Sequence, residues 1–218
     1  MKMIRIIKRG IELILDQERA LYIPYYQLLV ISDFHLGKSG HFRKEGLQIP
    51  KQVSETDIMR LDHLVAMYNP KTLLVTGDMF HHHHNMDLEE FRIWRTANKT
   101  LEIILVKGNH DKLAGIFYEQ LAINLFSTYY EIGDFCFVHE RKDAPDHGKY
   151  IFSGHIHPGI LLKGPARQRL KLPCFVFDDT SALLPAFSLF TGLYLIQAKT
   201  GQEVFAITAN RVTTVATF

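Results

Sequence analysis

Short, largely apolar runs recur along the chain, and polar residues follow each of them in a similar arrangement. The runs cover residues 28–31, 73–76, 103–106, 135–138 and 150–153. Continuously apolar runs of this length, bounded by polar residues and glycines, are typical of strands buried on both faces. The pattern therefore predicts at least five buried strands, each of which leads into a polar loop.

Apolar residues at helical spacing lie between the first of these strands. The segment from Ser54 to Tyr68 opens with Ser-x-x-Asp, which is typical of a helix start, and its apolar residues fall on one face. A second helix is predicted over residues 86–97, with Asp87 as its N-cap. Strands that alternate with helices in this way indicate βαβ units and parallel pairing.

The second half of the chain has a different pattern. From about Ala122 to Phe218 it is rich in short runs of Thr, Val, Phe and Ile, which favour strands. We expect these strands to form a second sheet packed on the first. The predicted fold class is thus α/β, a sandwich of two sheets flanked by helices, formed by a single domain that spans residues 1–218.

The amino-acid composition is that of an ordinary globular protein. The chain has 218 residues, of which 47% are hydrophobic and 22% charged. Its longest apolar runs are far shorter than the roughly 20 residues that cross a bilayer, and no secretory signal is evident, so we expect a cytoplasmic protein. Cys136 and Cys174 lie in strand-like runs and are predicted to be buried free thiols. A net charge of +2 is too small to indicate nucleic acid by itself.

The polar residues after the strands are those that bind hard metal ions. In open α/β sheets the loops at the carboxyl edge converge on the ligand site, so we expect these side chains to lie together. Carboxylate, amide and imidazole groups suit Mn²⁺, Fe²⁺ or Zn²⁺, and we take Mn²⁺ as the first choice. One isolated histidine beside a strand is more often packed than a ligand, but five such motifs favour metal binding. The predicted ligands are Asp33, His35, Asp78, Asn109, His139, His155 and His157.

The order Asp-x-His, Gly-Asp, Gly-Asn-His-Asp, His and Gly-His-x-His resembles the signature of the calcineurin-like metallophosphoesterases. This resemblance implies a four-layer α/β/β/α sandwich with two mixed sheets. It also implies two ions, one held by Asp33, His35 and His157 and the other by Asn109, His139 and His155, with Asp78 between them. A carboxylate suits that place because its two oxygens can each bind one ion of a pair about 3.5–4 Å apart. The implied reaction is attack of a metal-activated water on a phosphate ester.

Two further residues have catalytic roles by the same resemblance. His110 stabilises or protonates the leaving oxygen, and Asp111 orients His110. A nearby carboxylate favours the imidazolium form, so we expect a raised pKa for His110. Asp111 has a second possible role, because an Asp just before Lys112 could also be a helix N-cap.

Other segments narrow the resemblance to one group. Leu36-Gly37-Lys38, the stretch from Gly77 to His81, and the late segments 184–187 and 190–192 are similar to the small bacterial ligase-associated phosphoesterases. That similarity implies a DNA endonuclease that works in repair with an ATP-dependent ligase and a helicase. We accordingly predict that Lys38, Arg43 and His81 contact the substrate.

Three functions remain open at this point. The first is a DNA endonuclease, the second a hydrolase of small phosphodiesters or nucleotides, and the third an inactive fold that serves as a protein-interaction scaffold. Two basic clusters are either solvated loop charge or a contact to phosphates. The first consists of Lys38, Arg43, Lys44 and Lys51, and the second of Lys163, Arg167, Arg169 and Lys171. The strands from Gln202 to Phe218 either complete a sheet or form the edge of a homodimer.

Overall fold

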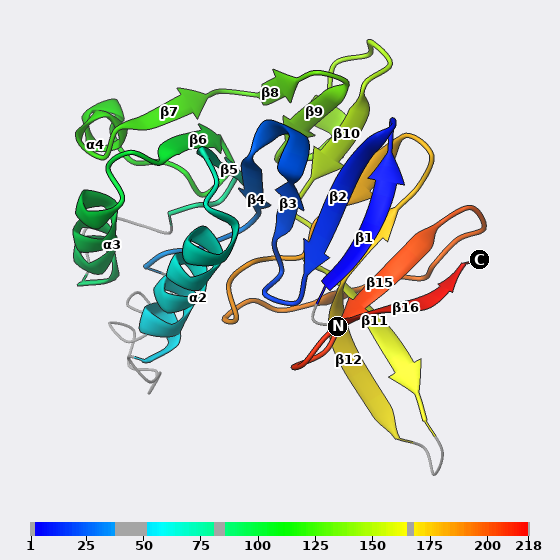
Figure 1. The fold of residues 1–218 in the computed structure, drawn as a ribbon. Coiled ribbons are helices and arrows are strands. Elements are labelled where there is room, and N and C mark those ends of the chain that lie inside the picture. Colours follow the sequence, from blue (N-terminus) through cyan, green and yellow to red (C-terminus); the bar gives the residue numbers. More distant parts are fainter. Residues whose placement is uncertain (1–2, 38–51, 81–85, 165–167, 218) are drawn as a thin grey trace.

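The computed structural model describes residues 3–37, 52–80, 86–164 and 168–217, and side chains are not described for residues 52–55, 86, 87, 216 and 217. Within this part of the chain, two sheets pack face to face (Figure 1). The first sheet has seven strands in sequence order: β1 (Met3–Lys8), β2 (Ile11–Asp16), β3 (Leu21–Ile23), β4 (Leu28–Ile31), β5 (Thr72–Thr76), β6 (Glu102–Val106) and β7 (Ile123–Phe126).

Pairing in the first sheet changes direction at β4. Strands β1 to β4 pair antiparallel, whereas β4 to β7 pair parallel through helical crossovers. The prediction of parallel βαβ units is therefore confirmed for this half of the chain. Strand β7 was expected in the second sheet but pairs with β6 in the first.

The second sheet is mixed and has nine described strands. Its main order is β14 (Tyr194–Leu195), β11 (Pro158–Lys163), β12 (Arg169–Phe177), β13 (Ser181–Leu183), β10 (Tyr150–Ser153), β9 (Phe135–Val138) and β8 (Tyr129–Ile132). Strand β15 (Glu203–Ile207) pairs with β12, and β16 (Val212–Thr217) pairs with β15. The C-terminal strands thus extend this sheet.

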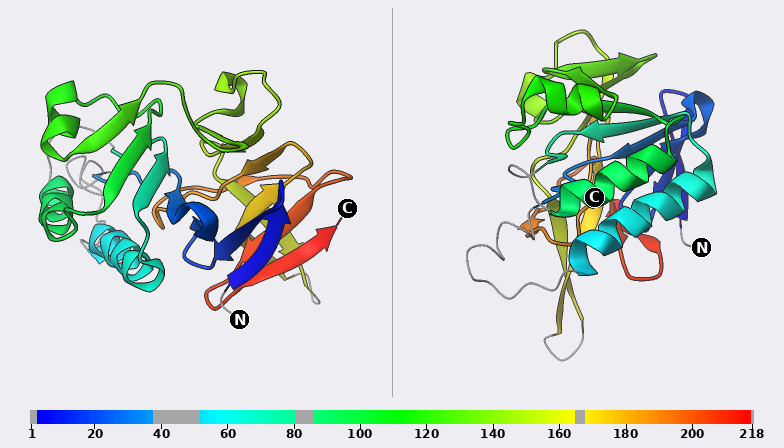
Figure 2. Two further views of the ribbon diagram at one scale, coloured as in Figure 1. Left: turned by 45° about the horizontal axis from the view of Figure 1, so that its top comes forward. Right: turned by 90° about the vertical axis from the view of Figure 1, so that its left-hand side faces the viewer.

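The helices cover the outer face of the first sheet (Figures 1 and 2). They are α2 (Gln52–Tyr68), α3 (Met86–Ala97) and α4 (Gly115–Gln120). Helix α2 begins two residues before the predicted Ser54, whereas α3 has the predicted bounds. Leu61 and Leu64 of α2 and Phe91 of α3 are buried against Leu73 and Val75 of β5 in one core.

A second core fills the space between the two sheets. It is rich in phenylalanine, and the rings of Phe137 and Phe152 stack with their centroids 5.0 Å apart. The outer face of the second sheet buries a smaller cluster that includes Ile160, Leu172 and Cys174. The predicted α/β sandwich is confirmed, and both cysteines are buried free thiols as predicted. None of the described helices has the length and apolar character that crossing a membrane requires.

Candidate metal centre

The predicted ligands are carried by loops at the carboxyl ends of β4, β5, β6, β9 and β10, as the sequence pattern indicated. Backbone hydrogen bonds join the first two loops: the N–H of Asp33 donates to the carbonyl of Gly77 at 3.1 Å, and that of His35 donates to the carbonyl of Asp78 at 2.8 Å. Several of these residues have a left-handed backbone that side chains other than glycine rarely adopt. They are Asp33, His35, Asp78, His155 and His157.

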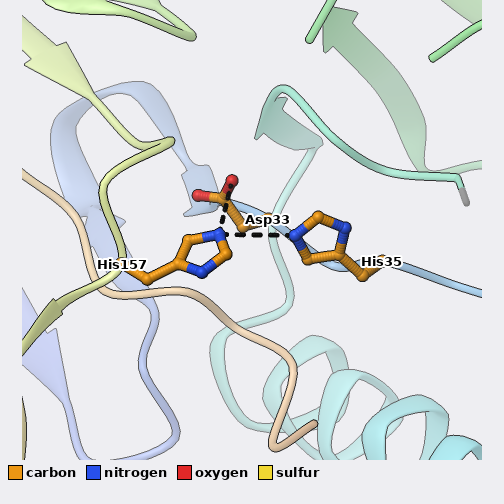
Figure 3. A group of neighbouring side chains, drawn as sticks. All are labelled: Asp33, His35 and His157. Atoms are coloured by element: carbon orange, nitrogen blue, oxygen red, sulfur yellow. Dashed lines mark hydrogen bonds and ion pairs between the residues drawn. The ribbon is translucent and has the colours of Figure 1, made fainter. Parts of the chain in front are cut away.

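Asp33, His35 and His157 form a first group of potential ligands (Figure 3). The Nε2 atoms of the two histidines lie 3.3 Å apart, and Nε2 of His157 is 3.2 Å from Oδ1 of Asp33. Asp33 and His35 are buried, and His157 is half-buried. Figure 3 shows Asp33 and His35 on one segment, the loop after β4, with the side chain of His157 reaching them from a second segment.

Asp78, His139 and His155 form a second group. Nδ1 of His155 lies 3.0 Å from Nε2 of His139, which is 3.5 Å from Oδ2 of Asp78. The side-chain oxygen of Asn109 is 3.1 Å from the same His139 nitrogen. The structure therefore brings the seven predicted ligands together in two groups. Asp78 lies in the second group, and its place between two ions stays a prediction.

The spacing of the donor atoms fits metal ions. Ligands about 2.1 Å from an ion are separated by roughly 3.0–3.5 Å when they subtend angles between 90° and tetrahedral. The closest donor pairs within each group lie 3.0–3.5 Å apart. Each of two imidazole nitrogens this close together carries either a lone pair or a proton. When both carry a lone pair, one cation between them can be bound by both. The oxygen and nitrogen donor set also suits Mn²⁺, Fe²⁺ or Zn²⁺.

Asp33 is held as an anion by its surroundings. Burial alone would raise the pKa of its carboxyl, but the hydrogen bond and the charge of His157 outweigh burial and hold this pKa below the ordinary value. Its Oδ2 accepts hydrogen bonds from Ser32 Oγ and from the backbone N–H of His155, the latter at 3.0 Å. Oδ1 is the atom that faces His157. One carboxylate oxygen thus binds the protein while the other faces the first group.

His110 lies at the rim between the two groups. Its backbone N–H donates to Oδ1 of Asp78 at 2.9 Å, and its Nε2 is 4.0 Å from Oδ2 of the same carboxylate. The ring centroid is 5.6 Å from that of His35, and 41% of the side chain is exposed. His110 therefore stands beside both groups with its ring accessible to a substrate.

Asp111 is buried and braces two of the ligand loops. Oδ1 accepts the N–H of Phe80 at 3.0 Å, and Oδ2 accepts the N–H of Gly108 at 2.9 Å. Burial raises the pKa of Asp111 to about 6, although these two donors oppose the rise. The alternative role of helix N-cap is wrong, because α4 begins at Gly115 and its N-cap is Ala114. The orientation of His110 by Asp111 stays a prediction.

Sequence reasoning missed groups that hold the ligands in place. Nδ1 of His139 lies 3.0 Å from the carbonyl oxygen of Thr76, which fixes Nε2 as the nitrogen that faces the second group. Glu140, which directly follows His139 in the sequence, places Oε1 3.8 Å from Nε2 of His155. Outer contacts of this kind orient metal-binding histidines. A carboxylate directly after a predicted ligand was a signal that could have indicated this role.

A segment far along the chain also supports the centre. The N–H of Phe187 donates to the carbonyl of Ser32 at 2.7 Å. Arg60 of α2 donates to the carbonyl of Phe187 at 2.8 Å and to Oδ1 of Asp57 at 2.7 Å, and its guanidinium lies over the Phe187 ring. The late segment 184–187, noted from sequence only as a family resemblance, therefore packs beside the first metal-binding loop.

The three predicted substrate contacts, Lys38, Arg43 and His81, lie outside the described residues, so their roles stay predictions. Arg167 of the second basic cluster lies outside them too.

Residues 26–148, more than half of the chain, match the sequence family of the calcineurin-like phosphoesterases. Among solved structures, the nuclease MPE from Pseudomonas putida is 31% identical, with a TM-score of 0.84 over 98% of this chain and 100% of that one. No curated protein sequence matches the chain significantly.

Two other solved structures resemble the chain more weakly. AQ665 from Aquifex aeolicus, a protein of unknown function, is 22% identical over 60% of this chain and 78% of that one, with a TM-score of 0.43. Yfce, a phosphoesterase from E. coli, is 12% identical over 88% of this chain and 99% of that one, with a TM-score of 0.44. Scores this low support no further argument.

Proposed function

This chain belongs to the calcineurin-like phosphoesterases and is a metal-dependent hydrolase of phosphate esters, and we propose that it cleaves phosphodiester bonds in DNA as an endonuclease with two metal ions. The observation that supports the proposal is the convergence of two ligand groups from loops at the carboxyl ends of strands in both sheets. Support for the substrate comes from the similarity over almost the whole chain to a solved nuclease.

In the proposed centre, Asp33, His35 and His157 hold one ion, and Asn109, His139 and His155 hold the other. Asp78 contributes to both. Ions bound at these positions supply Lewis acidity to the phosphate and lower the pKa of an attacking water. The carbonyl oxygen of Thr76 determines which nitrogen of His139 faces the centre, and Glu140 places a carboxylate 3.8 Å from Nε2 of His155.

His110 is the proposed general acid, which donates a proton from its ring to the leaving oxygen. Its place beside both groups and its exposed ring support this role. We expect His110→Ala to lower turnover about 10²–10⁴-fold while the metal content stays intact. His63, an exposed histidine on α2, provides the matched control, and His63→Ala should leave turnover unchanged. Loss of bound metal from the His110 variant, measured by mass spectrometry of the metals, would instead make His110 a ligand.

The shared role of Asp78 has its own test. Replacement by Asn keeps the size of the side chain but removes its charge. We expect Asp33→Asn to release one equivalent of metal and Asp78→Asn to release both. An Asp78→Asn protein that retains one full equivalent would show that this carboxylate serves a single ion.

The decisive experiment compares DNA with a small substrate. We expect the metal-loaded enzyme to nick DNA at low salt with Mn²⁺ and also to hydrolyse a chromogenic phosphodiester. If hydrolysis of the small diester is strong while nicking is absent across several metals, the substrate is a small phosphodiester or nucleotide and the endonuclease proposal fails.

Several narrower parts belong to the same proposal: Mn²⁺ as the native ion, a cytoplasmic role in DNA repair beside a ligase and a helicase, and substrate contacts from Lys38, Arg43 and His81. A homodimer is a further part, and β16, which pairs only with β15 among the described strands, offers an edge for it. Sedimentation of the purified protein tests the dimer, and a metal series in the nicking assay tests the ion.

A further inference from the structure

The hairpin formed by β11 and β12 extends beyond the second sheet as a two-stranded arm (Figure 1). Strand β14 pairs with β11 only at Pro158 and Gly159, and β15 pairs with β12 only from Cys174 onward. Between these limits and the turn, the two strands are hydrogen-bonded to each other without a third described strand beside them. Such a ribbon contributes little to a core of its own, so its side chains are available for other contacts.

The two faces of the arm differ sharply in character. Residues opposite each other in an antiparallel pair share a face, and Lys163 is opposite Arg169 while Lys171 is opposite Leu161. One face therefore carries the three cations. The other face pairs Leu162 with Leu170 and joins the apolar cluster on the outside of the second sheet.

The cations of the arm have no counter-charge among the described residues. Lys163, Arg169 and Lys171 are exposed, and no carboxylate among the described residues lies within 4.0 Å of them. The sequence from Pro158 to Phe177 contains no Asp or Glu at all. Like charges directly opposite each other destabilise a strand pair. An external anion that binds this face would remove the repulsion.

The arm is also joined directly to the metal centre. Strand β11 begins one residue after His157, and Lys163 lies five residues further along it. At about 3.4 Å per residue, Lys163 lies roughly 17 Å along the strand from Pro158. The same length corresponds to about five nucleotide steps of 3.4 Å along a DNA strand. On β12, side chains alternate between faces, so Arg169 and Lys171 project to the same side as Phe175, which packs against the first sheet. Along β12, the cationic side chains thus continue the side of the strand that carries Phe175.

From these features we propose that the β11–β12 arm binds the phosphate backbone of a polynucleotide about five nucleotides from the phosphate that is cleaved. This inference rests on the proposed nuclease function and adds a binding site to it. Lys163, Arg169 and Lys171 hold the backbone without reading sequence, since contacts to phosphates position a protein rather than specify bases.

The test compares two triple variants with equal loss of charge. The arm variant is Lys163→Gln, Arg169→Gln and Lys171→Gln. The control variant is Lys71→Gln, Lys99→Gln and Lys199→Gln, three exposed lysines outside the arm. Binding of fluorescent single-stranded and duplex 20-mers is measured between 50 and 200 mM NaCl on the metal-loaded full chain, in a His110→Ala background that keeps the DNA intact. Hydrolysis of a chromogenic phosphodiester, measured without that substitution, checks that the centre is unharmed.

Salt dependence gives the expected size of the effect. Each phosphate contact contributes a slope of about −0.9 for duplex and −0.7 for single strands in log affinity against log salt. Over this fourfold range of salt, three contacts correspond to about a 40-fold loss of affinity for duplex and about a 20-fold loss for single strands. The parent should show this extra loss relative to the arm variant, while the control variant follows the parent. The better-bound form identifies duplex or single-stranded DNA as the ligand.

The outcomes separate the arm from the nuclease function. Equal salt slopes for the arm variant and the control variant, or no binding of DNA by the parent, overturn the arm proposal. If the parent binds DNA through the arm but cleaves none, the arm stands and the endonuclease function fails. If removal of the three cations leaves DNA binding unchanged and Leu170→Ser instead changes the sedimentation mass, the arm binds a second copy of the chain. The polynucleotide proposal is then wrong.

Discussion

His155 offers a direct measure of the strain stored in the metal-binding loops. Its backbone φ is 66°, which lies in the left-handed region. For residues with a Cβ atom this conformation costs about 1–2 kcal/mol. Glycine has no such cost. The perturbation is a pair of substitutions, His155→Ala and His155→Gly, which remove the same imidazole contacts and differ only in the Cβ atom. Their difference in stability therefore reports on the backbone alone.

The expected order of stability of the Ala and Gly variants is the reverse of the usual one. At an ordinary position Ala is more stable than Gly by about 0.4–1 kcal/mol, because glycine leaves the unfolded chain more freedom. Subtracting this from a left-handed cost of about 1.5 kcal/mol leaves His155→Gly more stable than His155→Ala by about 1 kcal/mol. That difference corresponds to roughly 2–4 °C in melting temperature for a protein of this size.

Urea unfolding of both variants without added metal measures the difference. Asn109, a proposed ligand whose φ is not in the left-handed region, supplies the control pair, and there Asn109→Ala should be more stable than Asn109→Gly. An Ala variant at position 155 that is as stable as the Gly variant would show that the loop carries no backbone strain there, and the reasoning would be refuted.

Three more predictions concern metal binding, a glycine beside Asp78, and the turn at Asp178. Mn²⁺ at about 100 times its dissociation constant should stabilise the fold by about 2.7 kcal/mol. The melting temperature should then rise by roughly 5–10 °C, and a chelator should reverse the rise. An unchanged melting temperature would contradict the metal centre. In Gly108→Ala the new Cβ would clash with Oδ1 and the backbone nitrogen of Asp78 and would lie 2.9 Å from its Cγ. It should therefore displace both the backbone and the carboxylate of Asp78, the latter by at least about 0.6 Å, beyond the tolerance of about 0.2 Å for metal ligands. Metal analysis should show that this variant loses its ions, while Gly115→Ala, with nothing within 4 Å of the new atom, keeps them. Burial would raise the pKa of Asp178, but the N–H and hydroxyl donors of Thr180 and Ser181 hold this pKa below 3.8. The stability advantage of the parent over Asp178→Asn should therefore be complete above about pH 4 and disappear as the pH falls through the lowered pKa. Urea unfolding at several pH values measures this advantage, and it should find no such loss if these bonds are unimportant.

The buried strands that lead to the site were predictable from sequence because they are apolar on both faces. Strands β4, β9 and β10 have the bounds that the apolar runs predicted, and β5 and β6 each begin one residue earlier. Pairing partners were harder to predict. A run such as Ile123–Phe126 shows that a strand forms there, but its place beside β6 depends on contacts with residues distant in sequence.

The identities of the candidate ligands were also predictable, whereas their surroundings were not. Asp33 and His157 follow strands in a recognisable order. The roles of Thr76, Glu140 and Arg60 depend on where an acceptor or a guanidinium lies in space, which no local pattern encodes. Asp111 is the clearest example, because its motif indicates a partner for His110 while both its oxygens accept backbone N–H groups of two different loops.

The centre depends on the packing of the two sheets because each ligand group draws on both. Asp33 and His35 follow a strand of the first sheet, whereas His157 directly precedes β11 of the second. The N–H of His155 also reaches across to Asp33. The rings of Phe137 and Phe152, which stack side by side on adjacent strands of the second sheet, belong to the aromatic core between the two sheets. Because metal ligands tolerate displacements of only about 0.2 Å, the close packing of this aromatic core is a condition for binding the ions as well as for folding.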